Sequence, residues 1–397
     1  MFRTILTAIA LLFAAGAAAA APQSYPLELR QGDLSGDGAA VLTAEIGRAQ
    51  FILFGEDHGF ADSALVLRAI SKAARPQGFA YHAVETGPST TGLVASALKR
   101  DGVDGVAKLV RAAPLAIPFL SMREDAELAS EFVGAGADHL WGLDQEFVGA
   151  PALLLKRLAE IAPSDAARME VSHRLAAERK AAERGAQKDF LLFSADDKAF
   201  DTLATMFKGV DEAQSIIAGL RESAAIYQAY MRGENYASNA RRGALIAANF
   251  LKRFHEAGEP KAIFKMGADH LGLGTSPNNI VDVGTLASEI AAAHGRTALR
   301  ILFLPLGGSH TVFAPKLGNP FATEAYDDAD AKDFFAAIGV SKADLYAKGW
   351  TLIPLPPVRE ALETEKINAL KPMTKFLLLG FDYVITTPDA RPATPLY

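Results

Sequence analysis

Apolar runs of strand length recur along the chain, and stretches with helical periodicity separate them. In the first such stretch, residues 62–75, apolar side chains recur three and four residues apart with Arg and Lys between them. Strands that alternate with helices indicate βαβ units and a parallel sheet. The sequence therefore predicts an α/β protein in which flanking helices cover a central, mostly parallel sheet. The predicted strands are residues 49–56, 79–85, 138–144, 261–267, 298–306 and 376–387.

Residues 151–258 interrupt this alternation, because they contain no run of strand character and are rich in Ala, Glu, Lys and Arg. Charges at such a density are typical of solvated helix faces. The stretch lies between the third and fourth predicted strands. We expect a helical insert that caps the active-site edge of the sheet, within a single α/β domain over residues 21–397. A separately folding domain is the alternative.

The first 20 residues have the order of a secretory signal peptide, with Arg3 followed by an apolar run and then by small residues. The run is shorter than the roughly 20 apolar residues that span a bilayer, which favours cleavage after Ala20 over an uncleaved membrane anchor. No later part of the sequence is apolar for long enough to cross a membrane. We expect an exported protein, periplasmic or secreted, without stable membrane insertion.

Composition narrows the classes of function. The chain has 397 residues, of which 50% are hydrophobic, and a formal net charge of -6. It can bury a large core, and its negative charge gives no general attraction to nucleic acid. The absence of cysteine excludes disulfides, a thiol nucleophile and a thiolate metal site. We expect a small-molecule or peptide substrate as its partner, and no nucleic acid.

Polar residues, most of them ionisable, follow four of the predicted strands. In an open α/β sheet, ligands bind beyond the carboxyl ends of the strands. A single acid or histidine there is usually a helix cap or a loop hydrogen-bonding group, but its repetition on four strands beside several glycines favours a site. His310 follows the fifth strand and could join it. The residues on the first four strands are Glu56, Asp57 and His58; Glu85; Asp144, Gln145 and Glu146; and Asp269 and His270.

Several well-known motifs are absent. The sequence has no G-x-S-x-G nucleophile turn, no H-E-x-x-H zinc motif, no P-loop and no dinucleotide-binding glycine pattern. Residues 33–44 imitate a calcium loop, but Ala44 stands where a bidentate Glu is required, so we interpret the segment as a turn.

Five segments resemble the erythromycin esterase-like proteins in order and rough spacing: "IGRAQFILFGEDHG", "AVETG", "WGLDQE", "RRGALIAANFLKRF" and "KAIFKMGADHLGLG". The resemblance covers about residues 40 to 310. This chain has one residue fewer between Glu56 and His58, and Gly267 stands where that family carries a histidine. Both departures are similar to the related Tiki, TraB and ChaN-type proteins. The residues that match the family's site are Glu56, His58, Glu85, Arg242, Asn249 and His270.

The resemblance implies a hydrolase that activates water against an ester, lactone or amide bond. His58 would be the general base or a metal ligand, since an imidazole with a near-neutral pKa suits water activation at ordinary pH. Glu85 and Glu56 would orient His58 or share its proton, and His270 would complete the catalytic group. Substrate binding is expected from Arg242, Asn249 and Asp144. The Arg242 guanidinium could hold a substrate carboxylate or an Asp of the core.

Metal binding and three alternative functions stay open. The imidazoles and carboxylates of His58, Glu56, Glu85 and His270 suit a divalent ion such as Mn2+ or Zn2+, whereas the esterase resemblance implies a metal-free base. The Tiki-like relatives imply a metal-dependent peptidase, and the ChaN-like relatives imply a protein that binds haem or iron for uptake. A catalytically inactive recognition module is a further alternative.

Overall fold

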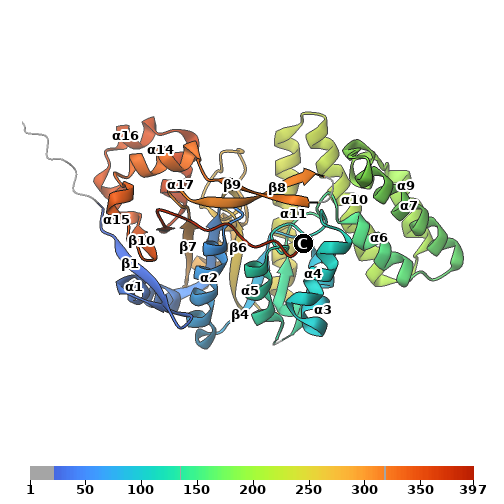
Figure 1. Ribbon diagram of the computed structural model, residues 1–397, viewed down its shortest axis with the longest axis horizontal. Coiled ribbons are helices and arrows are strands. Elements are labelled where there is room, and N and C mark those ends of the chain that lie inside the picture. Colours follow the sequence, from blue (N-terminus) through green and yellow to red (C-terminus); the bar gives the residue numbers. More distant parts are fainter. Residues whose placement is uncertain (1–21, 135, 317–318) are drawn as a thin grey trace, which may run out of the picture.

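A nine-stranded sheet forms the centre of the computed structural model, which describes residues 22–134, 136–316 and 319–397 (Figure 1). The predicted signal peptide lies outside the described residues. Six neighbouring strands are parallel, which confirms the predicted α/β class. In sheet order they are β11 (Tyr383–Thr386), β7 (Thr297–Phe303), β3 (Ala49–Glu56), β6 (Lys261–Gly267), β4 (Phe79–Val84) and β5 (Leu140–Gly142).

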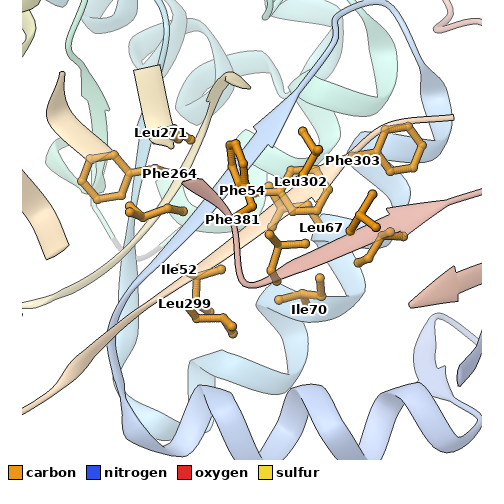
Figure 2. Close-up of a cluster of buried hydrophobic side chains, with 14 of the residues drawn as sticks. Ile52, Phe54, Leu67, Ile70, Phe264, Leu271, Leu299, Leu302, Phe303 and Phe381 are labelled. Atoms are coloured by element: carbon orange, nitrogen blue, oxygen red, sulfur yellow. The ribbon is translucent and has the colours of Figure 1, made fainter. Parts of the chain in front are cut away.

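Strand β3 lies in the middle of the sheet, and helices cover both of its faces. Residues 51–54 are fully buried, as expected for a parallel strand with two covered faces. On one face, the ring of Phe51 packs edge-on against Phe250 of α11 (Asn235–Glu256), with 5.6 Å between the ring centroids. Ile52 on the other face lies in a cluster of side chains that includes Ile70 of α2 (Ala61–Ala74) (Figure 2). This packing fixes where β3 ends and where its polar residues begin.

The predicted insert is helical throughout the regular elements that the structure describes in it. These helices have a hydrophobic core of their own, which includes Leu154, Leu192 and Leu220. Helix α11 contacts β5, and the other helices of the insert lie to one side of the sheet (Figure 1). None of the helices in the described ranges is long and apolar enough to span a membrane. Besides α11 and one short 3-10 turn, the insert comprises α6 (Pro151–Glu160), α7 (Asp165–Glu183), α8 (Leu191–Ser194), α9 (Asp197–Met206) and α10 (Asp211–Met231).

The strand prediction for residues 376–387 is wrong in its first half. Helix α17 (Pro372–Gly380) occupies it, and only β11 is a strand. A short apolar run does not distinguish a buried helix from a buried strand. Two further features were not predicted. An antiparallel extension adds β10 (Trp350–Pro354), β1 (Tyr25–Arg30) and β2 (Asp33–Ser35) to the sheet, and β8 (Ser309–Lys316) pairs with β9 (Asn319–Ala325) as a separate two-stranded sheet.

The tail of the chain lies across the loop that follows β3 and across the segment that contains Met122. It is irregular, as predicted, but Pro392 forms a bridge with Phe60, and Pro395 forms one with Met122. The guanidinium of Arg391 also donates a hydrogen bond of 2.7 Å to Asp62 at the start of α2. The tail therefore holds the segment between β3 and α2, which carries His58.

Candidate active site

Glu56 and His58 form a contact pair at the carboxyl end of β3. Glu56 is the last residue of the strand and is 3% exposed. Its Oε1 lies 2.9 Å from Nδ1 of His58 and accepts a hydrogen bond of 2.5 Å from Nζ of Lys265. The side chain of His58 is 31% exposed, so it is the member of this pair that a ligand can reach.

Phe119 covers one face of the His58 ring. The two rings are stacked with their centroids 3.9 Å apart. Phe119 has a φ of 59°, in the left-handed region that is rare for an aromatic residue. Strained backbone of this kind is often found where a loop holds a functional side chain in place. The loop thus fixes the imidazole plane through one face of the ring.

Glu85, at the end of the second predicted strand, also contacts His58. It follows β4, is 4% exposed, and places Oε2 3.4 Å from Nε2 of His58. The same oxygen accepts a hydrogen bond of 2.5 Å from the backbone N–H of Gly267. A Cβ atom at position 267 would lie 3.2 Å from His58 Nε2 and 3.3 Å from Glu85 Oε2. Glycine at this position allows the ends of β3, β4 and β6 to approach one another.

His270 lies on the other side of Glu85. It belongs to the short helix α12 (Ala268–Leu271), and its Nε2 is 3.6 Å from Oε1 of Glu85. Its Nδ1 lies 2.6 Å from Oδ2 of Asp282, which caps α13 (Val283–Ala293). Asp282 fixes the ring from behind, because its other oxygen accepts the N–H of Val283. The structure therefore brings together Glu56, His58, Glu85 and His270.

Arg242 and Asn249 of α11 contact the strand ends directly. The Arg242 guanidinium donates two hydrogen bonds to Asp144, of 2.9 and 2.6 Å, and a third of 2.8 Å to Oε1 of Glu85. Asn249 donates a hydrogen bond of 2.8 Å to the backbone carbonyl of Leu143. Of the two partners considered for Arg242, an Asp of the core is the one that it contacts in this structure. Both side chains thus join the insert to the sheet.

The charges of this cluster shift the titration of both histidines. Burial alone would lower the pKa of His58, but the carboxylates of Glu85 and Glu56 raise it to about 10. Glu85 and Asp282 likewise raise the pKa of His270 to about 10, against the effect of burial. Both imidazoles are therefore protonated at neutral pH. This differs from the near-neutral pKa on which the expected role of His58 rested, because two buried carboxylates face one ring.

The pKa values of Glu56 and Glu85 shift in the opposite direction, below their usual range. Burial would raise the pKa of Glu56, but Lys265 and His58 outweigh it and lower the value to about 2. The two histidines hold the pKa of Glu85 well below its usual range, again against burial. The shifts of the two glutamates and of the two histidines therefore each favour the charged form.

The four residues do not fit a divalent metal in this arrangement. Within the described ranges, no group of three or more His, Asp and Glu side chains is placed to hold a metal ion. Lys265 already neutralises Glu56, and Arg242 neutralises Glu85, at hydrogen-bond distance. The Nδ1 atoms of both rings are also taken, by Glu56 and by Asp282. The carboxylates that could bind a metal ion are therefore already paired with cations of the protein itself.

Other polar residues at the strand ends have local structural roles. Asp57 accepts the backbone N–H of His58 at 2.9 Å. Glu146 caps α3 (Pro88–Asp101), where its Oε1 accepts the N–H of Ser89 at 2.8 Å. His310 stacks on Phe60 with 5.5 Å between centroids. These contacts match the helix-cap and loop roles that single strand-end residues usually have.

Three charged residues of the cluster were not predicted: Lys265, Asp125 and Asp282. Lys265 could have been found, because a lysine inside the apolar run 261–267 must be paired if that run is buried. Asp125 and Asp282 gave no comparable signal, since acids at helix starts are common.

A groove with a volume of about 1370 Å³ borders the cluster on the side of the insert. Its lining includes parts of α3, α4 (Val103–Ala112), α6, α10 and α11. Asp144 and Asn249 belong to the lining, whereas His58, Glu85 and His270 do not. Of the expected substrate-binding residues, these two are therefore next to an open volume.

Fold and site define an α/β protein with a helical cap and a cluster of histidines and carboxylates at the carboxyl ends of its parallel strands. Neither the family models nor the curated protein sequences contain a match to this chain. Solved structures do match it, and they confirm the erythromycin esterase-like fold that the motifs indicated.

Three such structures align with nearly the whole chain. A point mutant of erythromycin esterase EreC in its open conformation has a TM-score of 0.54 at 15% identity, covering 88% of this chain and 93% of its own. A Bacillus cereus protein has a TM-score of 0.53 at 13% identity, covering 89% and 92%. A succinoglycan biosynthesis protein has a TM-score of 0.54 at 12% identity, covering 90% and 92%. At these identities the similarity establishes the fold alone.

Proposed function

We propose that this protein is a hydrolase that activates water against an ester, lactone or amide bond. One observation carries the proposal: a partly exposed imidazole, His58, lies between two buried carboxylates at the ends of β3 and β4. A histidine oriented by a carboxylate is a common general base in hydrolysis. The match in fold to an erythromycin esterase structure supports the same reaction class.

In this proposal, Glu56 accepts the Nδ1–H of His58, so the base acts through Nε2. Loss of the Nε2 proton leaves a lone pair that can accept a proton from water. Transfer of the water proton to Nε2 then regenerates the imidazolium, which both carboxylates stabilise. Hydroxide attacks the carbonyl carbon, and the leaving group takes the proton from His58. The residues supply orientation and charge for each step.

A substrate screen tests the reaction class. Purified protein is assayed with panels of esters, lactones and peptides, in excess chelator and separately with added Mn2+ or Zn2+. We expect hydrolysis of at least one class in the presence of chelator, because the donor set is occupied by Lys265 and Arg242. Activity that requires the added metal would favour the metal-dependent peptidase, and no turnover on any panel would contradict the proposal.

The rate should depend on pH in the alkaline range. His58 acts as a base only when deprotonated, and its pKa is raised to about 10, so kcat/KM should still increase with pH above neutrality. In Glu85→Gln the largest contribution that raises this pKa is lost, and the increase should move to lower pH by about 1 unit or more. Glu146→Gln is a matched control, since its carboxylate caps α3 instead of facing a histidine. A profile of Glu85→Gln that coincides with wild type would contradict this role of His58.

We also infer export of the protein, on the signal-peptide order of the first 20 residues. N-terminal sequencing of protein recovered from the cell envelope should begin at Ala21. Intact Met1 on a cytoplasmic product would overturn the inference.

A further inference from the structure

Lys265 is a buried lysine in the middle of the sheet. Its side chain is 6% exposed, and its Nζ lies 2.5 Å from Oε1 of Glu56 and 2.8 Å from Oδ1 of Asp125. Burial of an ammonium group is costly unless the charge is paired, and lysine is rarely buried otherwise. Asp125 belongs to α5 (Arg123–Val133), so one ammonium group joins a helix to the end of β3.

The register of the sheet explains how Lys265 reaches Glu56. Lys265 pairs with Phe54 across the parallel strands β3 and β6. Glu56 is two residues beyond Phe54 and therefore lies on the same face of the sheet. The lysine side chain extends along that face to the carboxylate. Its position is set by backbone pairing rather than by a mobile loop.

Few other contacts orient the carboxylate of Glu56. Its Oε1 receives both Lys265 and His58, whereas its Oε2 is buried without a hydrogen-bond partner in the described structure. Of the two partners at Oε1, Lys265 is the buried one, and a further ion pair with Asp125 holds it. His58 is partly exposed and would change its protonation during the proposed reaction. The lysine is therefore the permanent anchor of this carboxylate.

We propose that Lys265, held by Asp125, is a positioning residue that fixes Glu56 as the acceptor for Nδ1–H of His58. The inference rests on the proposed function for its kinetic consequence, but the contact itself can be tested without a substrate. When the ammonium group is removed, burial favours the protonated form of Glu56. A protonated carboxyl group is a poorer acceptor, and His58 then loses the hydrogen bond that defines its orientation.

The test compares Lys265→Met with Lys261→Met. Both lysines are on the same face of β6, but Lys261 lies at the far end of the strand over the ring of Phe79. The first readout is the downfield proton NMR signal of the His58 Nδ1–H, assigned by its absence in His58→Asn. We expect the signal in wild type and Lys261→Met, and its loss in Lys265→Met. On a substrate from the screen, Lys265→Met should lower kcat by about 10- to 100-fold at unchanged KM.

Lys265→Met leaves two buried carboxylates without their cation and could fail to fold. In that case Lys265→Met combined with Asp125→Leu is used, because removal of a buried ion pair as a unit costs less stability than removal of one partner. The same loss of signal is expected. A wild-type signal retained in either folded variant, or absent from wild type itself, would overturn the inference. If the NMR result holds but no substrate is found, the proposed function fails while the positioning contact stands.

Discussion

Replacement of His58 by Asn should lower kcat/KM by about 10²- to 10⁴-fold, the usual contribution of a positioned general base. The loss should be in kcat, because the imidazole acts in the chemical steps, on water and on the leaving group, rather than in substrate binding. The free energy of unfolding should change little, because the side chain of His58 is partly exposed. Steady-state kinetics on the best substrate of the screen, above neutral pH, measures the effect.

His173→Asn is the matched control for this variant, because His173 lies exposed on α7 in the insert. Its kinetics should equal those of wild type. If His58→Asn retains wild-type kcat/KM while its fold is intact, His58 is not the base, and the cluster would then be a structural ion-pair network.

Replacement of Arg242 by Met should destabilise the protein by about 3 to 5 kcal/mol, the usual cost of removing one partner from a buried ion pair. Glu85 and Asp144 have side chains only 5% and 6% exposed, and both lose their guanidinium partner. Chemical denaturation at neutral pH measures the free energy of unfolding.

Arg241, the neighbour of Arg242 in sequence, offers a control because it is also an arginine paired with a carboxylate. Arg241 pairs with Glu222, but at the surface, where its side chain is 49% exposed. Arg241→Met should therefore cost about 1 kcal/mol or less. Equal losses in the two variants would mean that the contacts of Arg242 with the strand ends contribute no more than a surface pair.

The central strands could be predicted because their sequence pattern is continuous. The predicted bounds of β3 and β6 coincide with those in the structure, since buried parallel strands are apolar on both faces. Residues 376–380 are equally apolar but form a helix, and the pattern alone did not distinguish the two. Strands β1 and β10 pair residues more than 300 positions apart, which no local pattern specifies.

The site residues were predicted from the tendency of ligands to bind at the carboxyl ends of parallel strands. This selected Glu56, His58, Glu85 and His270, which the structure places in contact. The charge state of His58 could not be predicted in this way. It depends on which carboxylates face the ring and at what distance, and therefore on the approach of three strand ends that Gly267 permits. The partnership of Lys265 with Asp125 required the sheet register and the placement of α5.

The position of the tail has a consequence for the order in which the molecule is made. The pair of Arg391 with Asp62 joins residues 329 positions apart, and Asp62 follows the segment that carries His58. A ribosome produces the β3 segment long before Arg391. The surroundings of His58 therefore stay incomplete until residues 391–395 are available to pair, as in other folds with many long-range pairings.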